Sequence, residues 1–335
     1  MKLAEHLRRR AAARRSGRLF RLFLPLLPLL LPGTAALAFD DRLLAATALQ
    51  EERTLEGRLG VAVLDTANGQ TWAHRGNERF PMSSTHKAFL CGAVLDLAAQ
   101  GAARGELSLD REVPVDRAKL VPYSPATGTV PPGGTISLGA LCDAAIRYSD
   151  NTASNLLVAA IGGPPAFNAF LRSIGDRETR LDRAEPDLNE ATPGDPRDTT
   201  TPLAAARSLG QLLLGNRLPP PARATLMQWM ADDQVAGTLL RAGLPQGWWI
   251  ADKSGAGGHG SRSILAAIRP PGRPPGKSML LVAIYVTETA APREAADAAI
   301  ARIGAVLAQA VAQTPDQTPE PGGAPQPVPL PPPSR

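Results

Sequence analysis

The sequence predicts an α/β plus all-α fold, in which an antiparallel sheet built from both termini and flanked by helices stands beside an inserted all-helical domain. Apolar strand patterns occur at "GRLGVAVLDT" near the start and at "SRSILAAIRP" and "KSMLLVAIYVTE" near the end. Between them, residues 84 to about 240 are rich in alanine and leucine at helical spacing. Strands that flank a helical stretch can pair with each other, which leaves the helices as a separate layer.

The elements follow this order along the chain. A helix is expected at 42–54, followed by a hairpin whose Asn68-Gly69 turn leads from the first strand into "TWAHRG". Two loops, 121–134 and 180–198, interrupt the helical region, and the segment "GWWIADKSGAG" begins the second group of strands. The remaining helices are expected at 84–100, 137–148, 150–161, 164–174, 200–214, 221–230 and 291–310.

These patterns predict the domain organisation. The α/β domain is discontinuous and comprises residues 39–80 and 232–312, the all-α domain is 81–231 with the loop 180–198, and the active site is expected between them. Residues 313–335 contain too much proline to pack and are expected to be a disordered tail.

Residues 1–38 have the pattern of a signal peptide. An arginine-rich segment precedes the apolar run "LFRLFLPLLPLLLPG", and Ala36-Leu37-Ala38 offers small residues for cleavage before Phe39. The alternative is an uncleaved membrane anchor, but the run is short for a bilayer and contains Arg21 and several prolines. We therefore expect a periplasmic or secreted protein without stable membrane association, and Arg14-Arg15 hints at the twin-arginine route.

The positive net charge of the whole chain does not indicate an anionic partner, because most of it lies in residues 1–38. The chain is +5 overall, but residues 1–38 hold eight of its 36 Lys and Arg and one of its 31 acids, so the remainder is near −2. A nucleic-acid partner thereby loses its main support. We expect a small-molecule substrate and a monomer.

The two cysteines, Cys91 and Cys142, both lie in the exported part. In an oxidising compartment an even pair favours a disulfide, whereas the alternative is two buried thiols that act as small hydrophobic side chains. A disulfide here would close a loop of about 50 residues and contribute on the order of 4 kcal/mol in the chain-entropy model.

The stretch "PMSSTHKAFL" offers two pairs of nucleophile and base. Residues three apart share a helix face, so Ser84 can meet Lys87 and Ser83 can meet His86. Lys87 can accept the proton of Ser84 where burial and positive neighbours lower its pKa. Taken alone, however, the pattern is better explained by an N-cap serine followed by an exposed lysine.

Two later motifs favour the catalytic interpretation of Ser84 and Lys87 over the structural one. Ser149-Asp150-Asn151 precedes an expected helix, and Lys253-Ser254-Gly255 lies on an expected strand. Each motif alone has a structural explanation, as an N-cap turn and as a glycine that another backbone approaches. Together, and in this order, the three motifs match the signature of class A β-lactamases and penicillin-binding proteins. From about residue 42 to 310 the chain resembles a class A serine β-lactamase, one of the penicillin-recognising serine hydrolases.

The resemblance extends to "RLDRAEPDLNEATPGDPRDTT", residues 180–200. Glu185 and Asn189 are similar to the glutamate and asparagine with which the family's Ω-loop holds the hydrolytic water. By the same resemblance, Arg183 and Asp198 form the salt bridge that closes this loop, and the Glu185–Pro186 peptide bond is cis. Cys91 and Cys142 likewise fall where many members place a disulfide.

The resemblance implies hydrolysis of β-lactam antibiotics, penicillins and early cephalosporins, through a serine acyl-enzyme, and hence antibiotic resistance. Ser84 is the implied nucleophile, and its proton goes to Lys87, or to Glu185 through water. Ser149 passes a proton to the leaving nitrogen, and Glu185 activates the water that cleaves the ester. The implied substrate-binding residues are Tyr123, Asn151, Asn189, Lys253, Ser254, Gly255, Ala256 and Arg262, with Asp297 supporting Arg262 and the N–H groups of Ser84 and Ala256 holding the oxyanion.

Three alternatives are weighed against this interpretation. A metal-dependent hydrolase is disfavoured because the four histidines His6, His74, His86 and His259 form no ligand-spaced cluster, so neither a metal nor another cofactor is expected. A penicillin-binding D,D-peptidase or a non-hydrolysing penicillin sensor shares the first three motifs but lacks the Glu185 and Asn189 apparatus. In the β-lactamase interpretation, Ser83 is a wall residue of the cleft and His86 a variable filler.

Overall fold

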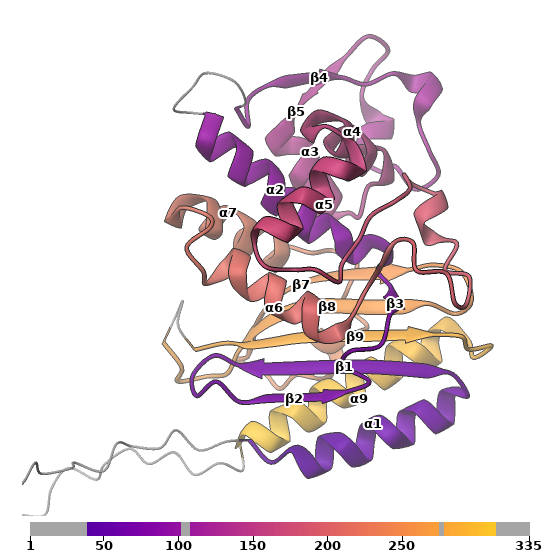
Figure 1. The fold of residues 1–335 in the computed structure, drawn as a ribbon, viewed down its shortest axis with the longest axis vertical. Helices are drawn as coiled ribbons and strands as arrows, with labels where there is room; N and C mark the ends of the chain where they lie inside the picture. The colour runs from indigo at the N-terminus through magenta and orange to yellow at the C-terminus, as the bar shows by residue number, and fades with distance from the viewer. Residues whose placement is uncertain (1–38, 102–107, 275–277, 313–335) are drawn as a thin grey trace, which may run out of the picture. The chain divides into compact units, whose positions relative to one another are not determined.

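The computed structural model describes residues 39–101, 108–274 and 278–312 (Figure 1). Its main feature is a five-stranded antiparallel sheet in the order β2-β1-β9-β8-β7. Its strands are β1 (Arg58–Asp65), β2 (Thr71–His74), β7 (Trp249–Ala256), β8 (Arg262–Arg269) and β9 (Leu280–Thr287). Since β1 pairs with β9 along its whole length, both ends of the chain build one sheet, and this prediction is confirmed. The expected signal peptide and proline-rich tail lie outside the described residues.

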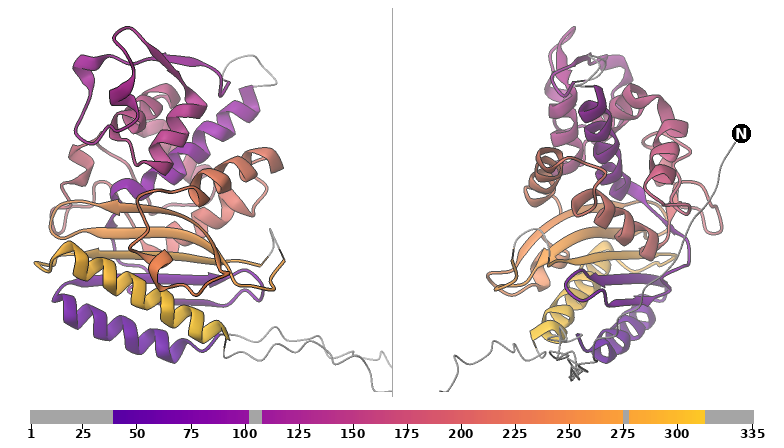
Figure 2. Two further views of the ribbon diagram at one scale, coloured as in Figure 1. Left: turned by 180° about the vertical axis from the view of Figure 1, so that it is seen from behind. Right: turned by 60° about the vertical axis from the view of Figure 1, so that its left-hand side comes forward.

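Helices cover both faces of the sheet (Figures 1 and 2). On one face, α1 (Asp41–Leu55) and α9 (Arg293–Ala312) lie side by side, and the single turn α8 (Leu240–Gly243) contacts α9. The helices of the middle of the chain belong to the other side: α2 (His86–Gly101), α3 (Leu138–Arg147), α4 (Asn151–Ile161), α5 (Gly163–Ser173), α6 (Pro202–Leu213) and α7 (Pro220–Ala231). Apart from α8, which was not predicted, the predicted helices end within two residues of these bounds.

Two short strand pairs were not predicted. β3 (Phe80–Pro81) pairs with β6 (Thr199–Thr200), and β4 (Glu112–Pro114) pairs with β5 (Thr135–Ser137). Runs of two or three residues are too short to show the alternating pattern of a strand. The first pair matters for function, because it joins the segment before Ser84 to the end of the loop 180–198.

Alternating side chains of the strands divide the apolar residues into two cores. Val61, Val63 and Val282 point to the layer that contains α1 and α9. Their neighbours Ala62 and Ala283 point to the other layer, where they pack with residues of α2 and α6. A strand that is apolar at every position is typical of a sheet that is covered on both sides. The sheet therefore separates the two helical layers, with one apolar core on each of its faces.

Helix α9 is the part of the described chain that is long and apolar enough to cross a membrane, by length and composition alone. The core helix of a soluble protein passes the same test. Ile300, Ile303 and Leu307 are buried in the core that α9 shares with α1 and the sheet. Its apolar character is therefore explained by packing.

The expected disulfide is not formed in the structure. Cys91 and Cys142 are free, buried thiols, and Cys91 Sγ lies 3.7 Å from the backbone carbonyl oxygen of Cys142. Burial and the neighbouring Cys91 raise the pKa of the Cys142 thiol. A buried thiol in apolar surroundings resists ionisation, which disulfide exchange requires. The pair acts here as two small core side chains, the alternative that the sequence had left open.

Candidate active site

Ser84 lies on η1 (Ser83–Thr85), a short 3₁₀ helix that leads directly into α2. Strand β7 packs against this turn, and Gly255 makes the approach possible. A Cβ atom at Gly255 would lie 3.0 Å from Ser84 N and 3.0 Å from Met82 O. The glycine of the third motif thus brings the end of β7 beside Ser84, as expected of a strand glycine that another backbone approaches.

Lys87 is completely buried and joins the first two motifs. Its Nζ lies 3.0 Å from Ser84 Oγ, 2.8 Å from Ser149 O and 2.6 Å from Asn151 Oδ1. Ser149 Oγ is 3.5 Å away, at the end of the same hydrogen-bonded group. Burial lowers the pKa of Lys87, although the charge of Glu185 opposes that shift. The Ser84–Lys87 pair predicted from the sequence is therefore assembled.

Glu185 is also buried and reaches the same lysine. Its Oε1 lies 3.2 Å from Lys87 Nζ, and its Oε2 accepts a hydrogen bond from Asn189 Nδ2. Asn155 of α4 holds its backbone, since the Glu185 N–H donates to Asn155 Oδ1 at 2.8 Å and Asn155 Nδ2 donates to Glu185 O at 2.9 Å. The Glu185–Pro186 peptide bond is cis, as predicted. Hydrogen bonds to both the backbone and the side chain thus hold Glu185 in place.

A salt bridge closes the loop that carries Glu185. Arg183 Nε donates to Asp198 Oδ2 at 2.6 Å, which confirms the predicted pair. The other oxygen, Asp198 Oδ1, accepts from the backbone N–H groups of Asp182 and Arg183. Glu190 adds a second ion pair to Arg183. The two ends of the loop are therefore joined through one buried carboxylate.

The turn between β7 and β8 holds the loop from its other side. The N–H of Gly258 donates to Asn189 O at 2.8 Å. A Cβ atom at Gly257 would lie 2.7 Å from Asn189 O, and one at Gly258 would lie 2.3 Å from Glu190 O. Both glycines are needed for this close contact of two backbones.

A cleft of about 230 Å³ opens in front of Ser84. Ser84, Ser149 and Ser254 present hydroxyl groups to it, and Tyr123, at its rim, is 58% exposed. Asn151 also lines it, while Asn151 Nδ2 donates to Pro122 O at 3.0 Å. The remaining lining residues are Asn189, Val235, Gly255, Ala256, Arg262 and Arg293.

Some predicted site residues lie behind the surface of this cleft. Lys87, Glu185 and Lys253 have side chains with no exposed area and do not line it. Lys253 Nζ donates to Ser254 O at 2.9 Å and lies 3.9 Å from Asp233 Oδ2. Burial lowers the pKa of Lys253 to about 8, against the opposing charge of Asp233. Lys253 therefore lies beneath the cleft surface, in contact with Ser254.

Arg262 enters the cleft from β8 and is itself almost fully buried. In the sheet register it stands opposite Ala256, while Lys253 stands opposite Leu265. Arg262 Nε donates to Asp297 Oδ1 at 2.5 Å and its Nη1 donates to Gly255 O at 3.1 Å. The predicted support of Arg262 by Asp297 is confirmed.

The second pair of the opening motif has a different arrangement. One ring nitrogen of His86, Nδ1, lies 2.7 Å from the backbone oxygen of Ser83, and the other, Nε2, lies 2.8 Å from Ser154 Oγ. The Ser83 hydroxyl has no hydrogen-bond partner in the described part of the chain. Ser83 is buried and is not among the cleft residues, so the prediction that it forms a wall of the cleft is wrong.

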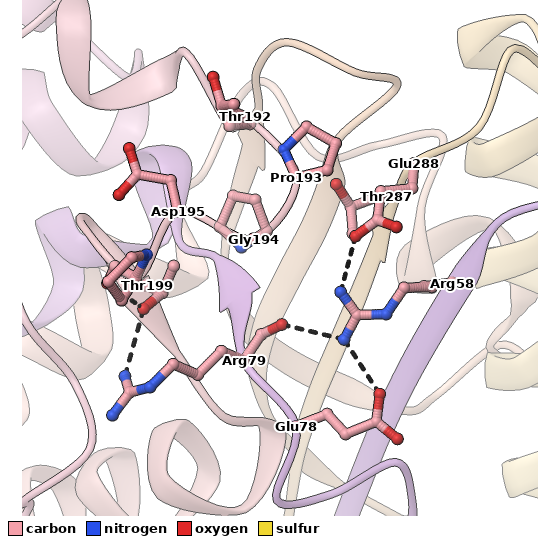
Figure 3. A pocket seen from close by; sticks show the side chains of 13 residues that line it. Arg58, Glu78, Arg79, Thr192, Pro193, Gly194, Asp195, Thr199, Thr287 and Glu288 are labelled. Carbon is pink, nitrogen blue, oxygen red and sulfur yellow. Dashed lines mark hydrogen bonds and ion pairs between the residues drawn. The ribbon is translucent and has the colours of Figure 1, made fainter.

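Another cavity, of about 260 Å³, lies between residues 191–196 of the same loop and the ends of β1 and β9 (Figure 3). Its charged side chains bind one another. Arg58 contacts Glu78 at 3.0 Å and Glu288 at 2.7 Å, and Arg79 donates to Thr199 Oγ1 at 3.2 Å. This cavity therefore offers a ligand fewer free polar groups than the cleft does.

Several functional residues escaped the sequence analysis. Asn155 could have been found, because it lies four residues after Asn151 on one helix face. Asp233, Val235 and Arg293 carry no such local signal, because they reach the site from segments distant in sequence. In the described part of the chain, no group of three or more His, Cys, Asp or Glu side chains is placed to hold a metal ion.

Comparison with known proteins identifies the family. Residues 44–311 match the model of the β-lactamase enzyme family. The chain is 52% identical to β-lactamase AER-1 of Aeromonas hydrophila over 83% of its length and 89% of that protein. It is 46% identical to β-lactamase PSE-4 of Pseudomonas aeruginosa over 76% of its length and 85% of that protein.

Comparison with solved structures identifies the same family. An ancestral class A β-lactamase superposes with a TM-score of 0.75 at 49% identity, covering 80% of this chain and 99% of the other. A β-lactamase from Xanthomonas campestris superposes with a TM-score of 0.76 at 41% identity, covering 81% and 98%. The three motifs, the assembled Ser84–Lys87–Glu185 group and these matches agree, and the chain belongs to the class A serine β-lactamases, enzymes that hydrolyse β-lactam antibiotics and so confer resistance.

Proposed function

We propose that this β-lactamase hydrolyses penicillins and early cephalosporins through an acyl-enzyme on Ser84, with Lys87 as the base of acylation and Glu185 as the base of deacylation. One observation carries the proposal. Lys87 Nζ lies 3.0 Å from Ser84 Oγ and 3.2 Å from Glu185 Oε1, so one buried amine connects the nucleophile to the carboxylate. The division of roles follows from these contacts.

The surroundings of Lys87 support its role in acylation. Four oxygens lie within 3.2 Å of Nζ, on Ser84, Ser149, Asn151 and Glu185, and the first of them is the hydroxyl oxygen that attacks the substrate. A neutral amine can donate to Ser149 O and Asn151 Oδ1 and accept the proton of Ser84 at its lone pair. The lowered pKa of Lys87 favours this neutral form.

Deacylation falls to Glu185. Asn189 donates to one of its oxygens, and the other faces Lys87 at the base of the cleft. A water bound between this carboxylate and Asn189 is positioned to attack the ester on Ser84, with Glu185 taking its proton. A sensor or a D,D-peptidase would not need a carboxylate fixed by Asn155, Asn189 and a closed loop.

The other cleft residues support binding and proton transfer. Ser149, beside Lys87, passes a proton to the leaving nitrogen, and Asn151 binds the amide of the acyl side chain. Ser254 and Arg262 bind the ring carboxylate, with Lys253 adding positive charge from beneath. The backbone N–H groups of Ser84 and Ala256 stabilise the oxyanion, an effect typically worth about 3 kcal/mol per donor.

The test uses the Glu185→Ala variant and a chromogenic cephalosporin. We expect a stoichiometric burst of acylation followed by a fall in turnover of about 10²- to 10⁴-fold, with the acyl-enzyme detected by mass spectrometry. Asp187→Ala, at an exposed position on the same loop, is the matched control and should retain turnover. If Glu185→Ala loses the burst as well, Glu185 and not Lys87 is the base of acylation; if it keeps full turnover, Glu185 is not the base of deacylation.

Three further proposals follow from the sequence. The chain divides into an α/β domain of 39–80 and 232–312 and an all-α domain of 81–231, a division supported by the separate cores on the two faces of the sheet. Residues 1–38 direct export and are then removed. The mature protein is a monomer without stable membrane association. Mass spectrometry of the exported protein, and light scattering of its purified form, test the last two.

A further inference from the structure

Arg293 is a cation of the active-site cleft that the mechanism above does not use. It is the first residue of α9, it is exposed, and it lines the cleft together with Ser254 and Arg262. In the described part of the chain, its side chain has no recorded hydrogen bond or ion pair. Its charge acts on Asp297 without an ion pair, so its guanidinium group remains available to a ligand.

The other two cations at this end of the cleft already have counter-charges. Arg262 is bound to Asp297 at 2.5 Å, and Lys253 lies 3.9 Å from Asp233. Burial acts against ionisation of Asp297, but the hydrogen bond from Arg262 and the charges of Arg262 and Arg293 keep the pKa of Asp297 below its ordinary value. Arg293 thus lies close to the Arg262–Asp297 pair, where the ring carboxylate is expected to bind.

The fold itself gains little from this charge. The N-terminus of a helix carries partial positive charge, so an arginine in the first turn is electrostatically unfavourable. Nearby Glu294 is exposed and forms no recorded ion pair with Arg293 in the described residues. Beyond its charge interaction with Asp297, a cation that lines the cleft and opposes the helix dipole has its favourable use in binding an anion.

We infer that Arg293 is a specificity-determining residue that favours β-lactams with a second anionic group next to the ring carboxylate, such as an acidic substituent on the six-membered ring of a cephalosporin. This inference rests on the proposed binding of the ring carboxylate by Ser254 and Arg262. All of these substrates carry the ring carboxylate. It would bind near Arg262 and Lys253, which already lie within ion-pair distance of Asp297 and Asp233. A second anion on that side meets Arg293, whose guanidinium acts on Asp297 only through its charge and forms no ion pair in the described part of the chain.

The test compares two cephalosporins that have the same acyl side chain and differ only in a methyl or a carboxymethyl substituent on the ring. The measured quantity is the ratio of kcat/KM for the carboxymethyl substrate to kcat/KM for the methyl substrate. Arg293→Gln should lower this ratio roughly two- to fivefold at low ionic strength, the range expected for a partly exposed charge pair. The effect should shrink at about 0.5 M salt, and Arg293→Lys should keep most of the wild-type ratio.

Two further variants distinguish the possible outcomes. Arg111→Gln removes the same charge from an exposed position that does not line the cleft, and should leave the ratio unchanged. An unchanged ratio in Arg293→Gln, or an equal fall in Arg111→Gln, overturns the inference. Arg262→Gln should lower kcat/KM for both substrates; if it does not, the proposed carboxylate site is wrong, whatever Arg293→Gln shows.

Discussion

Two serine–base pairs stand side by side at the start of α2, and the fold uses them in opposite ways. Ser84 Oγ contacts Lys87 Nζ at 3.0 Å and opens onto the cleft. His86 instead lies 2.7 Å from the backbone oxygen of Ser83 and 2.8 Å from Ser154 Oγ, and is completely buried. Equal spacing in sequence therefore produced one pair that we propose is catalytic and one structural contact.

The difference lies in what surrounds each pair. Ser149 and Asn151 of one segment and Glu185 of another surround Lys87, and their oxygens can exchange protons with its amine. His86 has its two nitrogens occupied, and the ring of Phe167 lies edge-on to it with centroids 6.5 Å apart. A base that is fully occupied by structural partners cannot serve a nucleophile.

The largest expected effect separates the two serines. Ser84→Ala should lower kcat/KM for a chromogenic cephalosporin by about 10⁴-fold or more, because the nucleophile is lost. Ser83→Ala should keep most of the activity, because the Ser83 hydroxyl does not face the cleft. Equal losses in the two variants would contradict the assignment of the nucleophile.

The next effect concerns the pH dependence of stability. Burial lowers the pKa of His86 to about 4, from an ordinary value of 6.5. The unfolded chain therefore binds a proton at His86 between these pH values while the folded protein does not. Stability should be fully present above about pH 6.5 and fall by roughly 3 kcal/mol towards pH 4. The free energy of unfolding of His86→Gln, measured in urea from pH 7.5 to 4, should lack this part of the slope. If both proteins show the same slope, His86 is not buried in neutral form.

A smaller effect is expected at the partner of the imidazole. Ser154→Ala leaves His86 Nε2 without its hydrogen bond inside the core and should destabilise the protein by about 1–2 kcal/mol. Urea unfolding at pH 7.5 measures the change. An unchanged unfolding midpoint would show that the contact contributes nothing to stability.

The smallest effect is expected at the hydroxyl of Ser83. This group is buried and has no hydrogen-bond partner in the described part of the chain. Its removal should relieve a desolvated polar group, so Ser83→Ala should leave stability unchanged or raise it by up to about 1 kcal/mol. The same urea experiment applies, and a marked destabilisation would reveal a partner for this hydroxyl.

Much of the fold was predictable because its signals are local. The strands are apolar over their length, the helices repeat with their own period, and side-chain caps such as Asp150 of α4 and Ser137 of α3 mark helix starts. The short pair of β3 and β6 was missed, because two residues carry no period. The disulfide prediction was wrong in this structure because redox context and spacing say nothing about the orientation of two thiols.

Site residues were predictable where they belong to one continuous sequence motif. Glu185, Asn189, Arg183 and Asp198 lie within one loop, and their contacts match the expectation. Arg293, which lines the cleft, and Asp233, which lies 3.9 Å from Lys253, were missed because they belong to segments far from the motifs. Such contacts depend on how the helices pack on the sheet and not on spacing along the chain.

The sequence by itself determined the family, the strand and helix pattern, and the grouping of Ser84 with Lys87, because each of these depends on residue type and local spacing. The tertiary structure decided which residues face the cleft and which lie behind it. Lys253 lies buried beside Ser254, Ser83 is buried and does not line the cleft, and Arg293 lines the cleft without forming an ion pair in the described part of the chain. Burial and orientation arise only when distant segments pack together, and they set the charge and the hydrogen-bonding capacity that each side chain can offer a substrate.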